Sequence, residues 1–459
     1  MTIPAQQQSS SRLPDRDGVI ARQAARESSA RTYARSLQMV PVEASGMTVR
    51  GADGRTYLDC LSGAGTLALG HNHPVVVEAV RNVIDSGAPW HSLDIATPQK
   101  DEFTDELFQT LPRSLQEKGR IQFCGPAGTD AVEAALKLTR TATGRQPVLS
   151  FTGAYHGMTA GALAISGGVS AKTPMAGVAA EGVRLPFPYD YRCPFGVGNG
   201  RTGDLSAAYV ERLLDDPNGG ILEPAGMIFE VVQGEGGVIP ASHEWVRQMR
   251  KITADRDIPL IVDEVQTGVG RTGTFWACQG AEVEPDVMVL SKAIGGTLPL
   301  AVVVYSDHLD EWQPGAHAGT FRGTTLAMAA GAATLRHVRE NQLQLRAAEV
   351  GDRIVARLTE LAAHHSCIGD VRGRGLMLGV EIVEPGSAPD AAGSRPADPS
   401  LALRIRKEAL SRGLIVELGG RHDAVVRLLP PLVITDEEVE TVLERLADSI
   451  AAAERAVAA

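Results

Sequence analysis

The chain has 459 residues, of which 44% are hydrophobic and 22% are charged. That length suggests two or three domains, and the composition is ordinary for a globular protein with a substantial core. The formal net charge is -11, which argues against nucleic acid or an anionic membrane as the main partner. Small-molecule substrates respond only to the local field, so they are not excluded.

The lack of a recognisable targeting signal and the usage of cysteine predict a cytoplasmic protein. The chain starts MTIPAQQQSSSRLPDRDG, without the apolar run of a secretory signal. No stretch approaches the roughly 18 apolar residues that a membrane-spanning helix needs. The cysteines are scattered and contain no CxxC pair, which favours buried free thiols over a disulfide framework or a zinc site. We therefore expect a cytoplasmic protein without a bound metal.

The N-terminal part predicts a tail, a helix and a hairpin. Residues 1–18 are polar and rich in Gln and Ser, so we expect a disordered tail. The charged, alanine-rich residues 19–38 predict a helix. Residues 47–60, MTVRGADGRTYLDC, alternate in polarity around a turn and predict a β-hairpin. We expect residues 19–70 to pack with a smaller domain at the other end of the chain.

Residues 71–335 are predicted to form a large α/β domain. From about residue 120 to 305, helical stretches alternate with the apolar runs RIQFC, PVLSF, AGMIFEVVQ, IPLIVDEV, DVMVLSK and LAVVVYS. Such alternation predicts a mostly parallel sheet with helices on both faces. Ligand-binding residues gather at the carboxyl ends of parallel strands, and Glu230, Asp263 and Lys292 lie there.

Residues 336–459 predict a smaller α/β domain, which the helical stretch LAMAAGAATLRHVREN precedes. Its helices are expected at about 343–363, 399–412 and 435–456. Its strands are expected near GLMLGVEIV and VVRLLPPLVI, and EPGSAPDAAGSRPADPS is a loop by composition.

A lone lysine follows the apolar strand in VMVLSKAIGG, residues 287–296. Burial at a strand end lowers the pKa of a lysine, and a neutral amine attacks an aldehyde to form a Schiff base. Lys292 is therefore a candidate nucleophile. Taken alone, it is also consistent with a side chain that reaches solvent or pairs with a carboxylate.

A carboxylate ends another strand in PLIVDEVQTGVGRTG, residues 259–273. An inward-facing Asp263 can pair with a protonated ring nitrogen, which makes a pyridinium an electron sink. Gln266 can donate to a phenolic oxygen on the same ring. The alternative is that Asp263 caps the turn that follows.

A turn between a strand and a helix occurs in QFCGPAGTDAVEAALK, residues 122–137. The N–H groups and dipole of a helix start suit a phosphate, Gly128 allows close approach, and the Thr129 hydroxyl can donate. Asp130 and Glu133 are equally consistent with ordinary carboxylates at a helix start.

An aromatic residue follows a further strand in FTGAYHGMT, residues 151–159. Tyr155 can cover the face of a flat ligand, although a core tyrosine is the alternative. An amine, a carboxylate for a ring nitrogen, a phosphate turn and an aromatic cover together describe pyridoxal phosphate.

The sequence resembles the class III pyridoxal-phosphate aminotransferases, which have fold type I. The matching motifs are GPAGTDAVEAALK, GAYHGMT, FEVVQGEGGV, IVDEVQTGVGRTG, VLSKAIGGTLPL and HAGTFRGT, in the family's order over about residues 40–435. Within the family, ESSARTYAR, YDYRCPFG and GLIVELGGR make the chain most similar to the diaminobutyrate–2-oxoglutarate aminotransferases.

The resemblance implies roles for the residues singled out above. Lys292 would form the Schiff base with the cofactor and move the substrate proton, and Asp263 would hold the pyridine nitrogen protonated. Gln266 would bind the phenolic oxygen, Gly128 and Thr129 the phosphate, and Tyr155 would stack on the ring.

The resemblance also implies a homodimer and a substrate arginine. Thr320 would reach the phosphate bound by the partner subunit, so that the site lies at the interface. Arg427 would bind the α-carboxylate of glutamate or 2-oxoglutarate. Glu235 would pair with Arg427 when an amine-ended substrate is bound, so that one pocket takes both substrates.

The chain departs from the family pattern at several positions. Ala127 stands where the subgroup often has serine, Val231 where proline is usual, and Thr324 where asparagine is usual. Met158 occupies the place of an arginine that many members carry after the stacking aromatic. A carboxylate at the far end of the substrate must then find another partner, for which the ESSARTYAR segment is one source.

The expected activity is a ping-pong aminotransfer between L-glutamate/2-oxoglutarate and L-aspartate 4-semialdehyde/L-2,4-diaminobutyrate. The alternatives are aminotransfer with another ω-amine (ornithine, acetylornithine or 4-aminobutyrate) and an aminomutase on the same fold.

Overall fold

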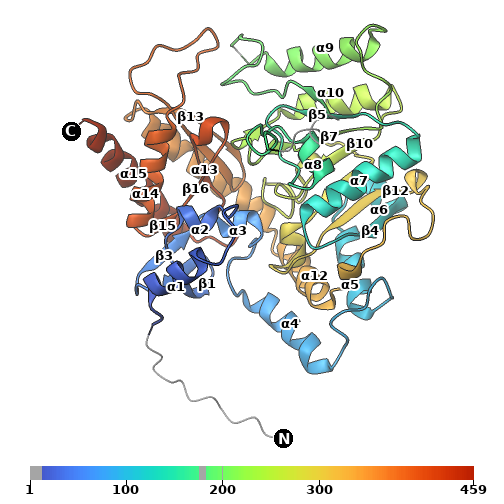
Figure 1. Ribbon diagram of the computed structural model, residues 1–459, viewed down its shortest axis with the longest axis horizontal. Helices are drawn as coiled ribbons and strands as arrows, with labels where there is room; N and C mark the ends of the chain where they lie inside the picture. The colour runs from blue at the N-terminus through green and yellow to red at the C-terminus, as the bar shows by residue number, and fades with distance from the viewer. Residues whose placement is uncertain (1–12, 175–181, 199, 459) are drawn as a thin grey trace, which may run out of the picture.

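A seven-stranded sheet forms the centre of the computed structural model, which describes residues 13–174, 182–198 and 200–458 (Figure 1). The strand order is β4-β12-β11-β10-β7-β5-β6, and β12 runs antiparallel to both of its neighbours. The strands are β4 (Gly119–Phe123), β5 (Val148–Phe151), β6 (Gly182–Leu185), β7 (Gly226–Phe229), β10 (Leu260–Asp263), β11 (Val287–Leu290) and β12 (Val302–Ser306). The predicted mostly parallel sheet is confirmed, and it belongs to the α/β class.

Both faces of this sheet are buried, because β7 and β11 are apolar at every position and β10 is apolar up to its last residue, Asp263. Alternate residues of β10 and β11 point to opposite faces and join two different hydrophobic clusters. On one face, Ile261 and Val287 pack with α7 (Gly128–Thr143). On the other face, Leu260 and Met288 share a cluster with Trp245 of α10 (His243–Ala254). Continuous apolar runs therefore mark these strands in the sequence.

Helices surround the central sheet and link it to the C-terminal part (Figure 1). The helix predicted from LAMAAGAATLRHVREN is α12 (Thr325–Glu340), and it packs on α4 (Pro74–Ser86) and α5 (Pro98–Phe108). The other α-helices between residues 60 and 290 are α3 (Ser62–Gly65), α6 (Arg113–Lys118), α8 (Ala160–Ile165), α9 (Thr202–Asp215) and α11 (Ala277–Gly280). Within the described ranges, no helix is both long and apolar enough to cross a lipid bilayer.

The C-terminal part contains a second sheet, in the antiparallel order β13-β14-β17-β16. Its strands are β13 (Ile368–Arg374), β14 (Met377–Ile382), β16 (Glu417–Gly419) and β17 (Val425–Leu428). Its helices are α13 (Leu343–Ala362), α14 (Pro399–Ser411) and α15 (Asp436–Ala458), close to their predicted positions.

The N-terminal segment joins the C-terminal part through a third sheet, β1-β2-β3-β15. Here β2 (Thr48–Gly51) and β3 (Thr56–Asp59) form the predicted hairpin, with β1 (Pro41–Ser45) beside β2. β15 (Leu414–Ile415) runs parallel to β3. A short ribbon of β8 (Val232–Gln233) and β9 (Ile239–Pro240) follows β7.

The single helix expected over residues 19–38 is wrong. The segment forms α1 (Arg16–Ala24) and α2 (Tyr33–Ser36), with irregular backbone between them. The Ser28 hydroxyl accepts a hydrogen bond from the Ala30 N–H at 3.2 Å, and such local bonds compete with helical ones. Of the expected disordered tail, residues 1–12 lie outside the described part of the chain.

The strand expected from VVRLLPPLVI stops at Leu428, because the two prolines that follow have no N–H to donate. Besides β1, β6 and β9 earlier in the chain, β13, β15 and β16 went unpredicted. β15 and β16 are very short, and β13 carries Asp370 and Arg372, which hide its apolar pattern.

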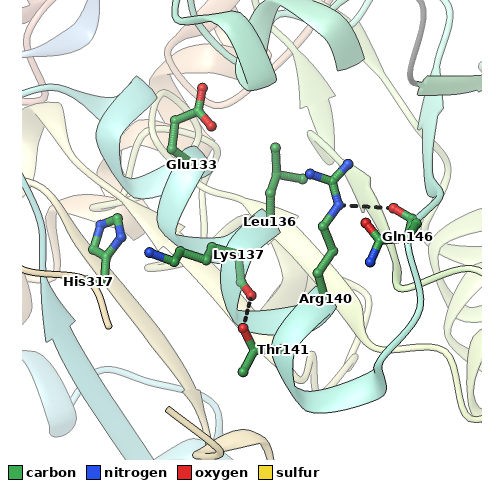
Figure 2. A pocket seen from close by; sticks show the side chains of 7 residues that line it. All are labelled: Glu133, Leu136, Lys137, Arg140, Thr141, Gln146 and His317. Carbon is green, nitrogen blue, oxygen red and sulfur yellow. Dashed lines mark hydrogen bonds between the residues drawn. The ribbon is translucent and has the colours of Figure 1, made fainter. Parts of the chain in front are cut away.

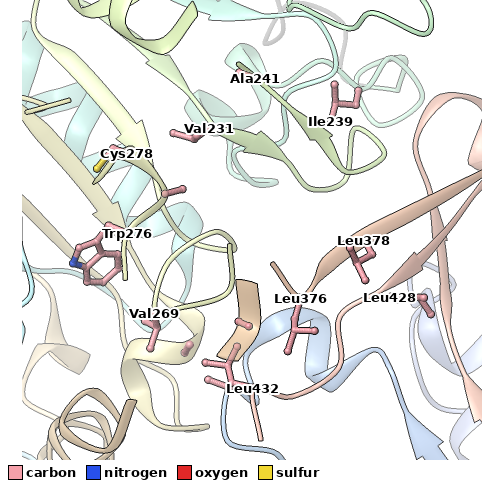
Figure 3. Packing of buried hydrophobic residues seen from close by; sticks show 14 of the residues in the cluster. Val231, Ile239, Ala241, Val269, Trp276, Cys278, Leu376, Leu378, Leu428 and Leu432 are labelled. Carbon is pink, nitrogen blue, oxygen red and sulfur yellow. The ribbon is translucent and has the colours of Figure 1, made fainter. Parts of the chain in front are cut away.

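A buried arginine joins the two main parts of the chain. Arg271, in the loop after β10, is 2% exposed and donates to the carbonyl oxygens of Leu376 and Pro430. Figure 3 shows Leu376 and Leu432 of the C-terminal part beside Val269 of the same loop. The hydrophobic core is therefore continuous across the junction.

Arg271→Met should lower the free energy of unfolding by about 2–4 kcal/mol, because it leaves two buried carbonyl groups without a donor. Chemical denaturation followed by tryptophan fluorescence measures the change. Arg113→Gln is the control, since it removes an exposed ion pair to Glu117. Equal stability of the two variants would contradict the assigned role.

Candidate active site

A cavity of about 250 Å³ lies at the carboxyl ends of the central strands. Seven of the nine residues named from the sequence as site residues line it, together with residues from the neighbouring loops. The lining residues are Ala127, Gly128, Thr129, Tyr155, His156, Gly157, Met158, Glu230, Glu235, Asp263, Val265, Gln266 and Lys292. The remaining predicted residues are Arg427, which contacts two of the lining side chains, and Thr320, which lies elsewhere.

Lys292 lies two residues after the end of β11 and has φ 52°, in the left-handed region that residues with side chains seldom adopt. Among the described residues, its amine has no hydrogen-bond partner. Burial lowers the pKa of Lys292, and the positive charge of Arg427 acts in the same direction. The negative charges of Glu235, Asp263 and Glu230 oppose the shift. The net result is an amine that loses its proton more readily than an ordinary lysine.

Asp263, the last residue of β10, is 4% exposed. One of its oxygens accepts from the Val265 N–H at 3.0 Å, and the other lies 2.7 Å from Nδ1 of His156. This geometry holds the carboxylate in place at the cavity wall. The alternative of a simple turn cap explains only the first of these contacts.

The turn before α7 places unpaired N–H groups at the cavity. Gly128 and Thr129 are the first two residues of the helix, whose N–H groups have no intrahelical acceptors. A Cβ atom at Gly128 would lie 2.9 Å from a methyl carbon of Val265, so the position requires glycine. The Thr129 hydroxyl bonds to the Thr159 hydroxyl at 2.6 Å.

The carboxylates of this helix have structural partners. Asp130 accepts from the Ala127 N–H at 3.0 Å, and Glu133 accepts from Thr159, Gly161 and Ala162 at the start of α8. The interpretation of both as carboxylates that stabilise helix starts is therefore correct.

Tyr155 is 42% exposed and lines the cavity, so it is not a core tyrosine. Its N–H donates to Glu230 at 2.9 Å, and the other Glu230 oxygen accepts from the Gly234 N–H at 2.9 Å. Burial raises the pKa of Glu230 to about 7, and the negative charge of Asp263 adds to the effect. Through these two hydrogen bonds, Glu230 links the backbone of the Tyr155 loop to the backbone at Gly234.

Arg427 is fully buried on β17 and is surrounded by acceptors. It donates to Glu235 at 2.8 Å and to the Gln266 side-chain oxygen at 3.0 Å. Glu417, its cross-strand neighbour on β16, lies 3.3 Å away. The predicted pairing of Arg427 with Glu235 is present, and Glu417 adds a second carboxylate. Although burial raises the pKa of Glu235, the charges of Arg427 and Lys292 lower it below its ordinary value.

Gln266 is engaged on both sides of its amide. Besides accepting from Arg427, it donates to the carbonyl oxygen of Ala64 at 2.9 Å. It still lines the cavity, so its second amide hydrogen is free to reach a ligand oxygen. Thr320 is exposed and does not line the cavity of its own chain.

A second cavity, of about 460 Å³, lies along the outer side of α7 (Figure 2). Its walls include Lys137, Arg140 and His317, and none of the predicted site residues lines it. Among the described residues, no group of three or more His, Cys, Asp and Glu side chains is placed to hold a metal ion.

Sequence and structure comparisons agree with this geometry. The family model described as aminotransferase class-III matches residues 29–450. A diaminobutyrate–2-oxoglutarate aminotransferase of Rhizobium meliloti is 55% identical over 93% of this chain and 91% of its own length. The chain belongs to the class III aminotransferases.

Other relatives extend the comparison. A diaminobutyrate–2-oxoglutarate aminotransferase of Haemophilus influenzae is 44% identical to this aminotransferase over 94% of each chain. Among solved structures, a PLP-bound amine transaminase from an uncultivated Pseudomonas species has a TM-score of 0.83 and 28% identity, covering 93% of this chain and 98% of its own. The fold of the aminotransferase is therefore that of fold type I.

The cavity of the aminotransferase fits the family's cofactor, pyridoxal phosphate. The free N–H groups before α7 suit a phosphate, and the Asp263 carboxylate suits a protonated ring nitrogen. Nε2 of His156 is buried and has no partner among the described residues, so a polar ligand atom nearby would satisfy it. When bound, pyridoxal phosphate supplies an aldehyde conjugated to an electron-withdrawing ring.

Glu417 contributes to the site but was not predicted from the sequence. Glu230 was predicted only to lie where ligand-binding residues gather, and His156 only as a hydrogen-bonding residue near the cofactor. Glu230 lies at a strand carboxyl end, the signal that also marked Asp263. His156 and Glu417 had only their place within the motifs GAYHGMT and GLIVELGGR. Burial and pairing, which decide their roles, are visible only in the folded chain.

Lys292 of the apoprotein should become reactive below the ordinary lysine pKa of 10.5, because burial lowers its pKa. An amine is reactive only when it is neutral, so labelling should rise as the pH passes this lowered pKa. Glu235→Gln should move the midpoint to still lower pH, because the Glu235 charge stabilises the ammonium form of Lys292. Competitive acetylation followed by mass spectrometry of the Lys292 peptide measures both midpoints. A midpoint at the ordinary lysine value would contradict the assignment.

Proposed function

We propose that the protein transfers an amino group between L-glutamate/2-oxoglutarate and L-aspartate 4-semialdehyde/L-2,4-diaminobutyrate, in two half-reactions that share one site. The names of the relatives support this substrate pair. The observation that carries it is the buried Arg427 between Glu235 and Glu417. If a substrate carboxylate can replace Glu235 on Arg427, the site can bind a dicarboxylic substrate. If Glu235 stays in place, the same site can bind a diamine.

In this proposal each residue of the site has a separate role. Lys292, with its lowered pKa, moves the proton at the substrate carbon that bears the amine. Asp263, oriented by His156, keeps the ring nitrogen protonated. Tyr155 covers the ring face, while Gly128 and Thr129 bind the phosphate. Gln266 binds the phenolic oxygen and also holds Arg427 in position.

Arg427 distinguishes the two half-reactions. With glutamate or 2-oxoglutarate bound, it forms a bidentate pair with the α-carboxylate and releases Glu235. With the diamine bound, the pair to Glu235 at 2.8 Å neutralises the buried guanidinium. Ornithine, acetylornithine and 4-aminobutyrate are the competing amine substrates, and an aminomutase would need no 2-oxoglutarate.

A homodimer with Thr320 serving the partner's site belongs to the same proposal. Trp90, Leu93, Ile95 and Phe321 are large apolar residues between 48% and 67% exposed, and His91 packs edge-on against Phe321 at 5.6 Å. Exposed apolar groups gathered in this way favour a subunit contact. Thr320 is next to Phe321, so the contact would carry it to the second site.

The visible absorbance of the cofactor-loaded enzyme tests the substrate pair. The band should bleach with L-2,4-diaminobutyrate and return with 2-oxoglutarate, because each half-reaction changes the form of the bound cofactor. Lys292→Ala should bind cofactor but lose at least about 10³-fold in the rate of bleaching, since its proton-transfer group is missing. If the band bleached with glutamate but not with L-2,4-diaminobutyrate, the protein would still be an aminotransferase, but diaminobutyrate would be rejected as its substrate.

The role of Thr320 can be tested with hybrid dimers. Thr320→Val homodimers should bind pyridoxal phosphate more weakly, by about tenfold for one lost hydrogen bond to a charged group. Hybrids with Lys292→Ala subunits should regain one tight, active site, because the Lys292→Ala chain supplies an intact Thr320. Hybrids that stay as weak as the Thr320→Val homodimer would show that Thr320 acts in its own subunit. Fluorescence titration of cofactor measures the affinities.

A further inference from the structure

A larger cavity, of about 830 Å³, adjoins the cofactor cavity and shares Lys292, Glu235, Tyr155 and Met158 with it. Its other walls come from α2, α14 and the loop around β16. A substrate attached near Lys292 would extend into this space. The side chains on these walls therefore meet the end of the substrate that does not react.

Arg406, on α14, is the only arginine that lines this cavity among the described residues. It has no hydrogen bond or ion pair to any described residue, and its Nε is buried without a partner. Burial lowers the pKa of Arg406, while the charges of Asp423 and Glu417 act in the opposite direction. An unpaired, partly buried guanidinium at a substrate cavity is suited to an anionic ligand.

Glu417 lines the same cavity from β16. Its side chain is 11% exposed, and one carboxylate oxygen is buried without a hydrogen-bond partner, although Arg427 lies 3.3 Å away. Burial also raises the pKa of the nearby Tyr33 hydroxyl, and the Glu417 charge adds to this shift. An unsatisfied carboxylate oxygen in this position is suited to a cation.

The diamine presents both kinds of group. When the γ-amine of 2,4-diaminobutyrate reacts at Lys292, the far end carries a carboxylate and an ammonium on the same carbon. Met158 gives that carboxylate no charge partner. The cavity has one unpaired arginine, Arg406, and one mostly buried, partly unsatisfied carboxylate, Glu417, and the charges of the two act on each other. Asp423, the other carboxylate that acts on Arg406, is exposed.

We propose that Arg406 binds the carboxylate, and Glu417 the ammonium, of the amino-acid end of 2,4-diaminobutyrate that faces away from Lys292. This inference rests on the proposed function and names the residues that determine its amine substrate. For glutamate, whose α-carboxylate pairs with Arg427, the side-chain carboxylate reaches Arg406 and Glu417 has no ammonium to bind.

Two smaller amines separate the roles of the two residues. 1,3-Diaminopropane is 2,4-diaminobutyrate without the carboxylate, and 4-aminobutyrate is the same molecule without the α-ammonium. The bleaching rate of the cofactor-loaded enzyme as a function of amine concentration gives kcat/KM for each half-reaction. Comparing the three amines in each variant isolates one charged group of the substrate at a time.

Arg406→Gln should lower kcat/KM about tenfold or more for 2,4-diaminobutyrate and for 4-aminobutyrate, and leave 1,3-diaminopropane unchanged. Glu417→Gln should lower it similarly for 2,4-diaminobutyrate and for 1,3-diaminopropane, and leave 4-aminobutyrate unchanged. Glutamate affinity is compared only between the wild type and Arg406→Gln, where it should fall, because Glu417 also pairs with Arg427, which binds the glutamate α-carboxylate. Arg404→Gln and Glu444→Gln, at exposed positions, are the matched controls and should change none of these values.

A uniform loss over all three amines, or no loss at all, would overturn the inference. Folding is checked by the cofactor absorbance of each variant, and Arg406→Lys should recover part of the lost activity if charge is what matters. The two levels of the proposal fail separately. A wild-type enzyme that ignores 2,4-diaminobutyrate refutes the proposed function, whereas a wild-type enzyme that uses it without the crossed pattern refutes only the inference.

Discussion

The cost of burying charge at the end of β11 shapes the rest of the site. Lys292 is desolvated, so its ammonium form survives only to the extent that Glu235, Asp263 and Glu230 offset that cost. Those carboxylates are buried too, and each needs its own donors. Asp263 has His156 and the Val265 N–H, Glu230 has two backbone N–H groups, and Glu235 has Arg427. One buried amine therefore requires a connected set of polar partners.

Arg427 extends this set into the C-terminal part of the chain. Two carboxylates and one amide oxygen meet a single guanidinium, so the protein supplies more negative charge than the arginine alone needs. Displacing one carboxylate leaves the guanidinium still partly neutralised. A substrate carboxylate can thus replace Glu235 at a lower cost than if it were the only partner.

Most of the central sheet could be predicted because its strands are short, continuous apolar runs, as in Val287–Leu290. Lys292 and Asp263 could be found for the same reason, since each ends such a strand. Glu417 and Arg406 could not, because their environment arises from the pairing of β16 with β17 and from the packing of α14. The helix expected over residues 19–38 failed where serine side chains bond locally to the backbone.

The two parts of the chain contribute different functions to one pocket. The residues proposed to hold the cofactor come from the loops of the central sheet, whereas Arg406, Glu417 and Arg427 come from α14, β16 and β17. Because Arg271 and the shared core fix the junction, the distance between the two groups is set by the fold. Substitution on α14 or β16 can therefore change which amine is recognised without moving Lys292 or Asp263. The methionine at position 158 is compatible with this division, because Arg406 lines the same cavity and offers the positive charge that Met158 lacks.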